Sequence, residues 1–332
     1  MLDLRSGPLA VAGLVRPSRK ERLLATAEAL HVQTSEPPRL HPLARLRELA
    51  RDREILGNLV RKEVKVKYKS SVLGAAWSML NPVLYLAVFS LVFGVVLHNG
   101  IPNFPVYLLS GILAWNLFAT SLGLGARSVV DNANLVTKVY FPREILPFAS
   151  IGAAMVDFGL QAVVLVAFIV ISQDFHAGWN LVLLPLSMIA LLTFTAAITL
   201  WVASLNVRYR DTQHLLNLAL LAWFWVTPIV FPSGAVFNRL HLHSVLGVNL
   251  FDVFLANPMA DIVFGFQRAL YAVTAPLIPD PAHAGKLIPV LVPESVAWLA
   301  LLLVGVTVVS LGLFLLAWRT FFNLSGDFAE EL

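Results

Sequence analysis

The chain has 332 residues, of which 58% are hydrophobic and only 13% are charged, about half the charged share of an ordinary soluble domain. This composition excludes a soluble globular protein and indicates a membrane protein with several spans. The net charge of +4 comes mainly from residues 1–71, which hold 15 of the 24 lysines and arginines, and the absence of cysteine excludes disulfides, thiol catalysis and thiolate metal sites.

The chain begins with a predicted flexible cytoplasmic tail, residues 1–42, which has scattered charges and prolines and no sustained hydrophobic period. Residues 43–71 then predict an amphipathic interface helix, because leucines gather towards one face and arginines occupy the rest. Within this segment, residues 64–68 alternate with the period of a strand. The sequence therefore leaves the end of the helix open.

Four residues directly before the first span are predicted to frame a substrate entrance: Lys65, Lys67, Tyr68 and Lys69. Two interpretations of the lysines are open. They can anchor the chain in anionic headgroups, or they can capture a substrate that carries a diphosphate.

Six stretches are long and apolar enough to cross the roughly 30 Å hydrocarbon core as helices. We expect them within a transmembrane domain of residues 72–332, at about 72–97, 105–126, 146–172, 181–204, 214–232 and 296–318. With the N-terminus inside, the inner segments carry 21 lysines and arginines and the outer segments carry three. The positive-inside rule then predicts that both termini are cytoplasmic.

Aromatic residues form a stripe along one face of the first span and gather again in the fifth. The residues are Trp77, Tyr85, Phe89, Phe93, Trp223 and Trp225. Such residues can simply pack or face lipid. They can also line a conduit for sugars, whose C–H faces stack on aromatic rings without a fixed orientation.

The third span carries Asp157, with Gln161 one turn later. An ionisable residue at this depth is costly and is expected to face the interior of the bundle. It can form a structural hydrogen bond with Gln161 or with a neighbouring helix. A proton relay would need further buried acids or histidines, and the spans offer no convincing set.

Two segments between spans are also distinctive. The inner loop 131–147 is either a turn or a short helix presented to a cytoplasmic partner. The outer segment 233–295 is too apolar for a simple loop, and within it Asn257 and Pro258 have the residue types of an N-cap and a first helical position. The helix that they begin is too short to span, so we predict a re-entrant or interfacial helix.

The sequence contains no Gly-x4-Gly-Lys-Ser/Thr motif, which excludes ATP binding through a P-loop of its own. No metal site and no nucleic-acid partner is predicted. The outer carboxylates are scattered without a convincing pair, so we do not predict an enzyme. These carboxylates are Asp174, Asp252, Asp261, Asp280 and Glu294.

Five stretches, in this order, resemble the permease subunit of type-2 ABC exporters for polysaccharides and polyol phosphates. They are "VRKEVKVKYKSSVLGAAWSMLNPVLYLAVFSLVFG" (60–94), "NLVTKVYFPREILP" (134–147), "VRYRDTQHLLNLALLAWFWVTPIVFP" (207–232), "ANPMADIVFGFQRALY" (256–271) and the terminal "GDFAEEL". The resemblance covers about residues 43–332.

The resemblance implies an all-α permease of the type-2 ABC exporter fold, with six spans, an N-terminal interface helix and re-entrant helices before the last span. It implies a homodimer in the bacterial cytoplasmic (inner) membrane, paired with two copies of a separate ATPase subunit that uses ATP and Mg. No cofactor is expected on this chain itself. The implied substrate is a glycan linked to a polyprenyl diphosphate, such as O-antigen, teichoic acid, capsule or galactan, which moves to the outer leaflet.

The resemblance also implies roles for particular residues. The first inner loop would form a coupling helix on the ATPase, with Asn134, Leu135, Lys138, Tyr140 and Arg143 as contact residues. The re-entrant region would form an outer gate with Asn257, Pro258 and Arg268, and the first and fifth spans would line an aromatic channel. Two alternatives stay open: a type-2 ABC exporter of another substrate, such as a drug or a lipid, and a membrane-embedded glycan-processing enzyme.

Overall fold

The computed structural model describes residues 51–98, 100–139, 141–172, 178–245, 247–271, 277–279 and 287–332. The chain divides into two units, Met1–Leu40 and His41–Leu332, and every described residue belongs to the second. The predicted tail and the first part of the predicted interface helix lie outside the described residues.

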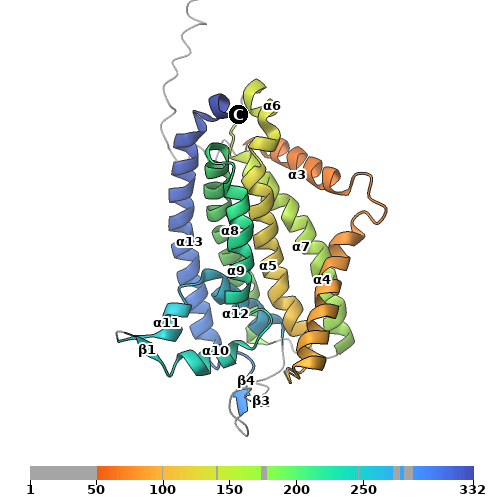
Figure 1. Cartoon of the computed structure of the whole chain (residues 1–332), viewed down its shortest axis with the longest axis vertical. Coiled ribbons are helices and arrows are strands. Elements are labelled where there is room, and N and C mark those ends of the chain that lie inside the picture. The colour runs from red at the N-terminus through yellow and green to blue at the C-terminus, as the bar shows by residue number, and fades with distance from the viewer. Residues whose placement is uncertain are drawn as a thin grey trace, which may run out of the picture. The chain divides into compact units, whose positions relative to one another are not determined.

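Five helices in the described part of the chain are long and apolar enough to cross a membrane. They are α4 continued by the π-helix η1 (Ala76–Phe89 and Ser90–Val96), α5 (Phe104–Arg127), α7 (Ile145–Ser172), α8 preceded by the 3-10 turn η3 (Leu183–Arg208 and Trp179–Val182), and α13 (Val296–Ser325). Helix α8 packs against both α5 and α13, and α7 packs against α5 (Figure 1). The mostly helical, multi-span class predicted from the sequence is confirmed.

The fifth predicted span, 214–232, is not one continuous helix. Helix α9 covers Thr212–Val226, and its 15 residues reach about 22 Å at 1.5 Å per residue, which is less than the hydrocarbon thickness. The helix ends here because Pro228 disfavours helical geometry at Thr227, whose ψ is 130°. The sequence prediction counted an unbroken span because residues 227–231 are as apolar as the helix before them.

Residues 227–231 are nevertheless enclosed by protein. Ile229 and Val230 are buried. The carbonyl of Pro228 accepts a hydrogen bond from Nε2 of Gln267 at 3.1 Å, and the carbonyl of Phe231 accepts one from the Tyr107 hydroxyl at 2.8 Å. Non-helical backbone at membrane depth needs such partners, because lipid supplies none.

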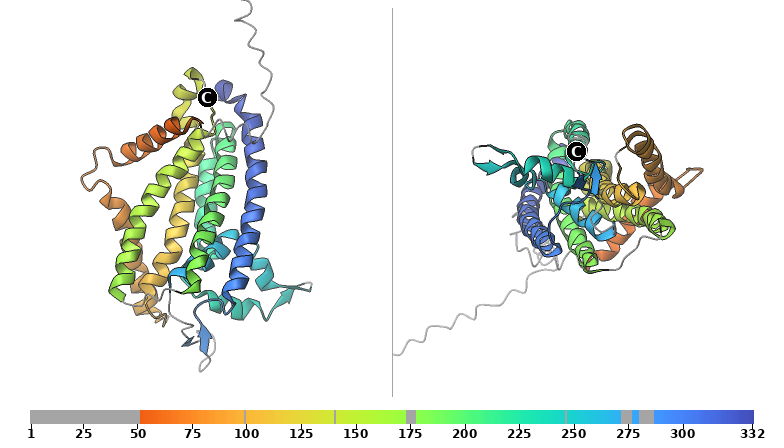
Figure 2. Two further views of the ribbon diagram at one scale, coloured as in Figure 1. Left: turned by 180° about the vertical axis from the view of Figure 1, so that it is seen from behind. Right: turned by 90° about the horizontal axis from the view of Figure 1, so that it is seen from below.

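The described part of the interface segment is a single helix, α3 (Arg53–Tyr68), which passes through the strand-like residues 64–68 without a break. It packs against α7 (Figure 2), where Gly152 faces Val60 of α3. A Cβ atom on Gly152 would lie 2.6 Å from Cγ2 of Val60, so a larger residue here would force the two helices to shift.

One end of the unit holds α3, the short helices η2 (Val130–Asn132) and α6 (Ala133–Lys138), and the C-terminal α14 (Phe328–Glu331) (Figure 1). A hydrophobic cluster joins these elements to the neighbouring ends of α7, α8 and α13. Its buried members include Leu59, Val136, Ile145, Leu200, Trp318 and Phe328. This cluster fixes α6 against the ends of the long helices.

The opposite end holds α10 (Ser233–Leu240), α11 (Leu250–Phe254), α12 (Pro258–Leu270) and two antiparallel hairpins. The hairpins pair β1 (Ser244–Val245) with β2 (Val248–Asn249), and β3 (Leu277–Pro279) with β4 (Leu287–Pro289), with Ile278 opposite Ile288. Helix α12 lies among α5, α8 and α13 and is too short to span.

The predicted start of α12 is confirmed. Asn257 is its N-cap and accepts a hydrogen bond from the Met259 amide at 3.2 Å, and Pro258 is the first helical residue. An Asn side chain followed by Pro satisfies the start of a helix locally. This is why the sequence alone could predict it.

Candidate functional site

The end of α3 is tied to α7 through the buried carboxylate of Asp157. Nζ of Lys67 lies 2.5 Å from Oδ2 of Asp157, the Tyr68 hydroxyl donates to Oδ1 at 2.6 Å, and the Ser78 hydroxyl donates to Oδ1 at 2.9 Å. The cluster therefore joins three elements, α3, α4 and α7. Asp157 is only 4% exposed, and an unpaired carboxylate in such a place would be costly.

These contacts separate the four residues predicted to frame an entrance. Lys67 is neutralised by Asp157 and is not a free cation. Burial raises the pKa of Tyr68 above its ordinary value, and the bond to Asp157 acts in the same direction. The Tyr68 hydroxyl thus keeps its proton and donates a hydrogen bond to the carboxylate.

The structure also decides the partner of Asp157. The sequence left open a bond to Gln161 or to a neighbouring helix, and the observed partners lie on the neighbouring helices α3 and α4. Gln161 instead accepts a hydrogen bond from Nδ2 of Asn116 on α5, at 2.8 Å.

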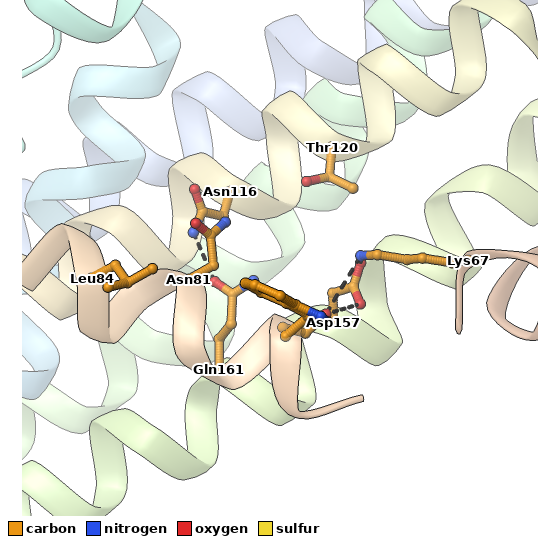
Figure 3. A pocket seen from close by; sticks show the side chains of 9 residues that line it. Lys67, Asn81, Leu84, Asn116, Thr120, Asp157 and Gln161 are labelled. Atoms are coloured by element: carbon orange, nitrogen blue, oxygen red, sulfur yellow. Dashed lines mark hydrogen bonds and ion pairs between the residues drawn. The ribbon is translucent and has the colours of Figure 1, made fainter. Parts of the chain in front are cut away.

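A polar pocket of about 280 Å³ opens beside this cluster, between α3, α4, α5 and α7. Figure 3 shows the Lys67 side chain directed at Asp157 on one side, with Asn116 and Gln161 on the other. The remaining lining side chains are Trp77, Ser78, Asn81, Leu84 and Thr120. Helices that are otherwise apolar therefore place three amides at one hollow, and polar groups within membrane helices typically mark a functional path.

A second hollow, of about 440 Å³, lies along α3 where it meets α7. Its lining combines three valines and Tyr68 with three cationic side chains: Val60, Val64, Val156, Tyr68, Arg61, Lys65 and Lys69. The three cations are four residues apart and so share one face of the helix. We call this hollow the α3 groove. The sequence analysis missed Arg61, because the strand-like reading of residues 64–68 concealed its helical spacing with Lys65.

The predicted aromatic residues form more than one group. The Tyr85 ring stacks on Phe89 at 6.2 Å between centroids, and Phe89 stacks on Phe224 of α9 at 6.2 Å and contacts Phe93 at 6.0 Å. The stripe on α4 thus turns towards α9. Phe224 was not among the predicted channel residues, although it makes this contact. Trp77 instead lines the polar pocket.

The two tryptophans predicted in the fifth span point in different directions. Trp225 is 53% exposed, whereas Trp223 contacts Phe118 and Phe194 and donates from Nε1 to Oδ1 of Asn257 at 2.8 Å. Trp223 therefore connects α9 to the N-cap of α12. Arg268, in the last turn of α12, is half-buried.

The predicted ATPase contacts lie on and after α6. Asn134 and Lys138 are exposed, while Leu135 packs against the hydrophobic cluster at this end. Arg143 is half-buried, and burial lowers its pKa below the ordinary value. Tyr140 lies outside the described residues.

Behind this segment, the buried Glu144 accepts a hydrogen bond from Nε1 of Trp318 on α13 at 3.3 Å. Nζ of Lys62 on α3 also donates to Oδ1 of Asn132 in η2. The α6 segment is therefore held by α3 on one side and α13 on the other. Within the described ranges, no three His, Asp or Glu side chains come together as metal ligands.

Comparison with known proteins agrees with the geometry of this chain. Residues 56–240 match the family model described as ABC-2 type transporter. The chain is 34% identical over 226 residues to the "O-antigen export system permease protein RfbA" of Myxococcus xanthus, covering 68% of this chain and 84% of that protein. It is 30% identical to a protein of the same name from Klebsiella pneumoniae over 186 residues, which cover 55% of this chain and 71% of that protein.

A more distant relative is the "Polysialic acid transport protein KpsM" of Escherichia coli, with 22% identity over 208 residues, 61% of this chain and 75% of that protein. The family model covers more than half of the chain, and the Myxococcus protein is matched over most of its length. The chain belongs to the ABC-2 type transporter family.

Proposed function

We propose that this chain is the permease subunit of an ATP-driven exporter that moves a lipid-linked cell-envelope polysaccharide from the cytoplasm to the outer leaflet. The names of the relatives from Myxococcus, Klebsiella and Escherichia support the polysaccharide. The observation that carries the lipid-linked part is the α3 groove, whose lining combines valines with three cations.

The α3 groove fits a substrate with an apolar tail and an anionic headgroup. Lysine and arginine bind phosphate oxygens through strong, charge-assisted hydrogen bonds. The valines of the lining can take the first part of an isoprenoid chain, because burial of apolar surface is favourable. Lys65 and Lys69 keep the capture role predicted from the sequence, Arg61 joins them, and Lys67 leaves this group.

ATP hydrolysis is assigned to a separate subunit present in two copies, which uses Mg and docks on α6. Exposed Asn134 and Lys138 support this surface, and the hydrophobic cluster behind α6 would pass its movement to α7, α8 and α13. The α6 end is then the cytoplasmic side of the inner membrane. The positive-inside count supports this orientation, with both termini inside.

Two copies of the permease would form the complete pathway. We assign the sixth crossing to α9 together with residues 227–231, and the re-entrant outer gate to α12 with Asn257, Pro258 and Arg268. Tyr85, Phe89 and Phe93 would face the conduit with Trp225 of α9. The exposed faces of α4 and α9 in the single chain support a place for the second copy.

Two other functions remain as outcomes of the test. An ABC-2 exporter of a drug or a lipid would use the same α6 surface, with a different substrate in the groove. A glycan-processing enzyme would require a pair of acids on one outer face. Asp252 and Asp261 do not form such a pair, because Asp252 is exposed and Asp261 is fully buried.

The deciding experiment is depletion of this chain in its native cell, followed by mass spectrometry of lipid extracts. We expect a lipid-linked glycan to accumulate inside while the same polymer disappears from the cell surface. An unchanged surface polymer, or accumulation of a lipid without sugar, would overturn the proposed substrate.

A further inference from the structure

We propose that the polar pocket beside Lys67 and Asp157 binds one neutral sugar ring of the exported glycan, the ring next to the lipid diphosphate. The inference rests on the proposed function for the identity of the glycan, while the chemistry of the pocket comes from its own side chains. It assigns a binding role to residues that the sequence analysis left without one: Asn81, Asn116 and Gln161.

The pocket offers hydrogen-bond donors and acceptors that the protein itself does not use. Asn116 and Gln161 share one bond between Nδ2 and Oε1, and no other bond of either amide to the described residues is found. Asn81 is exposed on α4 between apolar neighbours. An amide carries two donors and two acceptor lone pairs, so these three side chains can pair with several ring hydroxyls at once.

The charge of the pocket favours a neutral ligand over a phosphate. Its charged lining residues are Lys67 and Asp157, and these already neutralise each other at 2.5 Å. A diphosphate placed here would approach the Asp157 carboxylate without a spare cation. A neutral sugar ring meets no such repulsion.

The size and the remaining walls of the pocket also suit a single ring. The volume of about 280 Å³ is just below the usual range of ligand sites and suits one ring rather than several. Trp77, 51% exposed, adds an indole face on which the C–H face of a sugar can stack. Leu84 adds an apolar side chain to the lining.

The position of the pocket relative to the α3 groove links the two sites. Tyr68 lines the groove with its side chain, and its hydroxyl bonds Asp157, which lines the pocket. One residue therefore separates the cation-rimmed groove from the sugar pocket. If the diphosphate of the lipid carrier binds in the α3 groove, the sugar attached to it would lie at the polar pocket.

Binding can be tested on the full-length protein in lipid nanodiscs by saturation-transfer NMR. The probes are neutral hexoses, a deoxyhexose and an N-acetylhexosamine, with inorganic pyrophosphate as the anionic probe. We expect saturable transfer to at least one neutral sugar, and no displacement of that sugar by pyrophosphate. Absence of saturable transfer from every neutral sugar, or displacement by pyrophosphate, would overturn the inference.

Variants locate the signal in the pocket. The double change Asn116→Leu with Gln161→Met removes both partners of one hydrogen bond and keeps similar side-chain volumes, so the fold should tolerate it. We expect this variant to lose the transfer. Trp77→Leu should weaken the sugar about fivefold, whereas Trp77→Phe keeps an aromatic face and should retain most of it.

The matched control is Thr307→Val on α13, which removes a hydroxyl that donates to the Leu303 carbonyl of its own helix. Thr307→Val should bind as the wild type does. Equal binding by the Asn116→Leu/Gln161→Met variant would overturn the pocket.

Export in cells separates this inference from the proposed function. If deletion of the chain leaves the surface polymer intact, the exporter function fails, while the nanodisc result still decides the pocket. If deletion abolishes export but the pocket variants export at the wild-type rate, the pocket fails and the exporter function stands.

Discussion

Nζ of Lys67, in the last turn of α3, lies 2.5 Å from the carboxylate of Asp157, which is buried in α7. The pair fixes where the interface helix ends relative to the long helices. It also removes Lys67 from the cations that could meet an anionic substrate. The lysine side chain is 43% exposed and the aspartate side chain 6% exposed. If the pair is broken, water can therefore solvate the lysine but not the aspartate.

We expect Lys67→Met to destabilise the protein more than Asp157→Asn. The first change leaves a buried carboxylate with only hydroxyl donors, whereas the second leaves a lysine that water can reach. Thermal unfolding in nanodiscs of both variants and of the double variant should show a coupling of about 0.5–3 kcal/mol. Additive effects would show that the pair contributes no specific stability.

Gly152→Ala is expected to destabilise the packing of α3 on α7 by about 1–3 kcal/mol, because the new methyl group would lie 2.6 Å from Cγ2 of Val60. The change Val60→Ala removes that methyl group and should restore much of the loss in the double variant. Thermal unfolding and protease sensitivity of the segment before α4 measure both effects. A double variant less stable than Gly152→Ala alone would contradict the proposed contact.

Lys138→Glu should uncouple ATP hydrolysis from export, since Lys138 is exposed on α6 and the proposed ATPase would meet a reversed charge there. We expect export to fall while the permease remains in the membrane at normal levels. Arg319→Glu is the matched control, because Arg319 is also exposed but belongs to α13. Normal export and normal ATPase assembly in Lys138→Glu would remove the coupling role from α6.

Asn257→Ala should lower stability by about 0.5–2 kcal/mol through loss of the N-cap of α12, and further through loss of the bond from Trp223. Asn257→Asp keeps an oxygen that accepts from both the Met259 amide and the indole, and should be close to the wild type. Thermal unfolding distinguishes the two variants. If both lose stability equally, the side-chain oxygen is not what matters.

Phe89→Ala and the triple change of Arg61, Lys65 and Lys69 to glutamine should affect different steps. Loss of the aromatic ring is expected to lower export without weakening the ATP hydrolysis that substrate stimulates, because stacking guides the glycan but does not capture it. Loss of the three cations is expected to weaken that stimulation about tenfold or more, since charge-assisted bonds to phosphate disappear. Both activities can be measured in proteoliposomes with the ATPase subunit.

The outcome for each class of variant is informative on its own. Unchanged stimulation in the triple variant would return the α3 groove to a contact with ordinary anionic lipids. Unchanged export in Phe89→Ala would leave the stripe on α4 as packing.

The sequence predicts the parts of this structure that local chemistry determines. Long apolar runs correctly predicted five of the six expected spans as long helices, and the Asn257-Pro258 pair predicted the start of α12. It failed at Pro228, where an apolar run hides the end of a helix. It also left the end of α3 open, because residues 64–68 alternate like a strand and five residues are too few to separate a helical period from a strand period.

The pairing of side chains was beyond the sequence. Asp157 contacts Lys67 and Tyr68 across about ninety positions of the chain, and only the packing of α3 on α7 brings them together. The spacing of Arg61, Lys65 and Lys69 was visible and could have identified the α3 groove. The amides of Asn81, Asn116 and Gln161 lie on three helices, so no pattern within one segment joins them.

The backbone that follows α9 depends on two donor side chains that lie far from it in the sequence. Gln267 and Tyr107 provide what water would otherwise provide at the carbonyls of Pro228 and Phe231. Both donor residues are fully buried, so water cannot take the place of either one. A substitution at Gln267 or Tyr107 would therefore leave a carbonyl without its donor in detergent and in lipid alike.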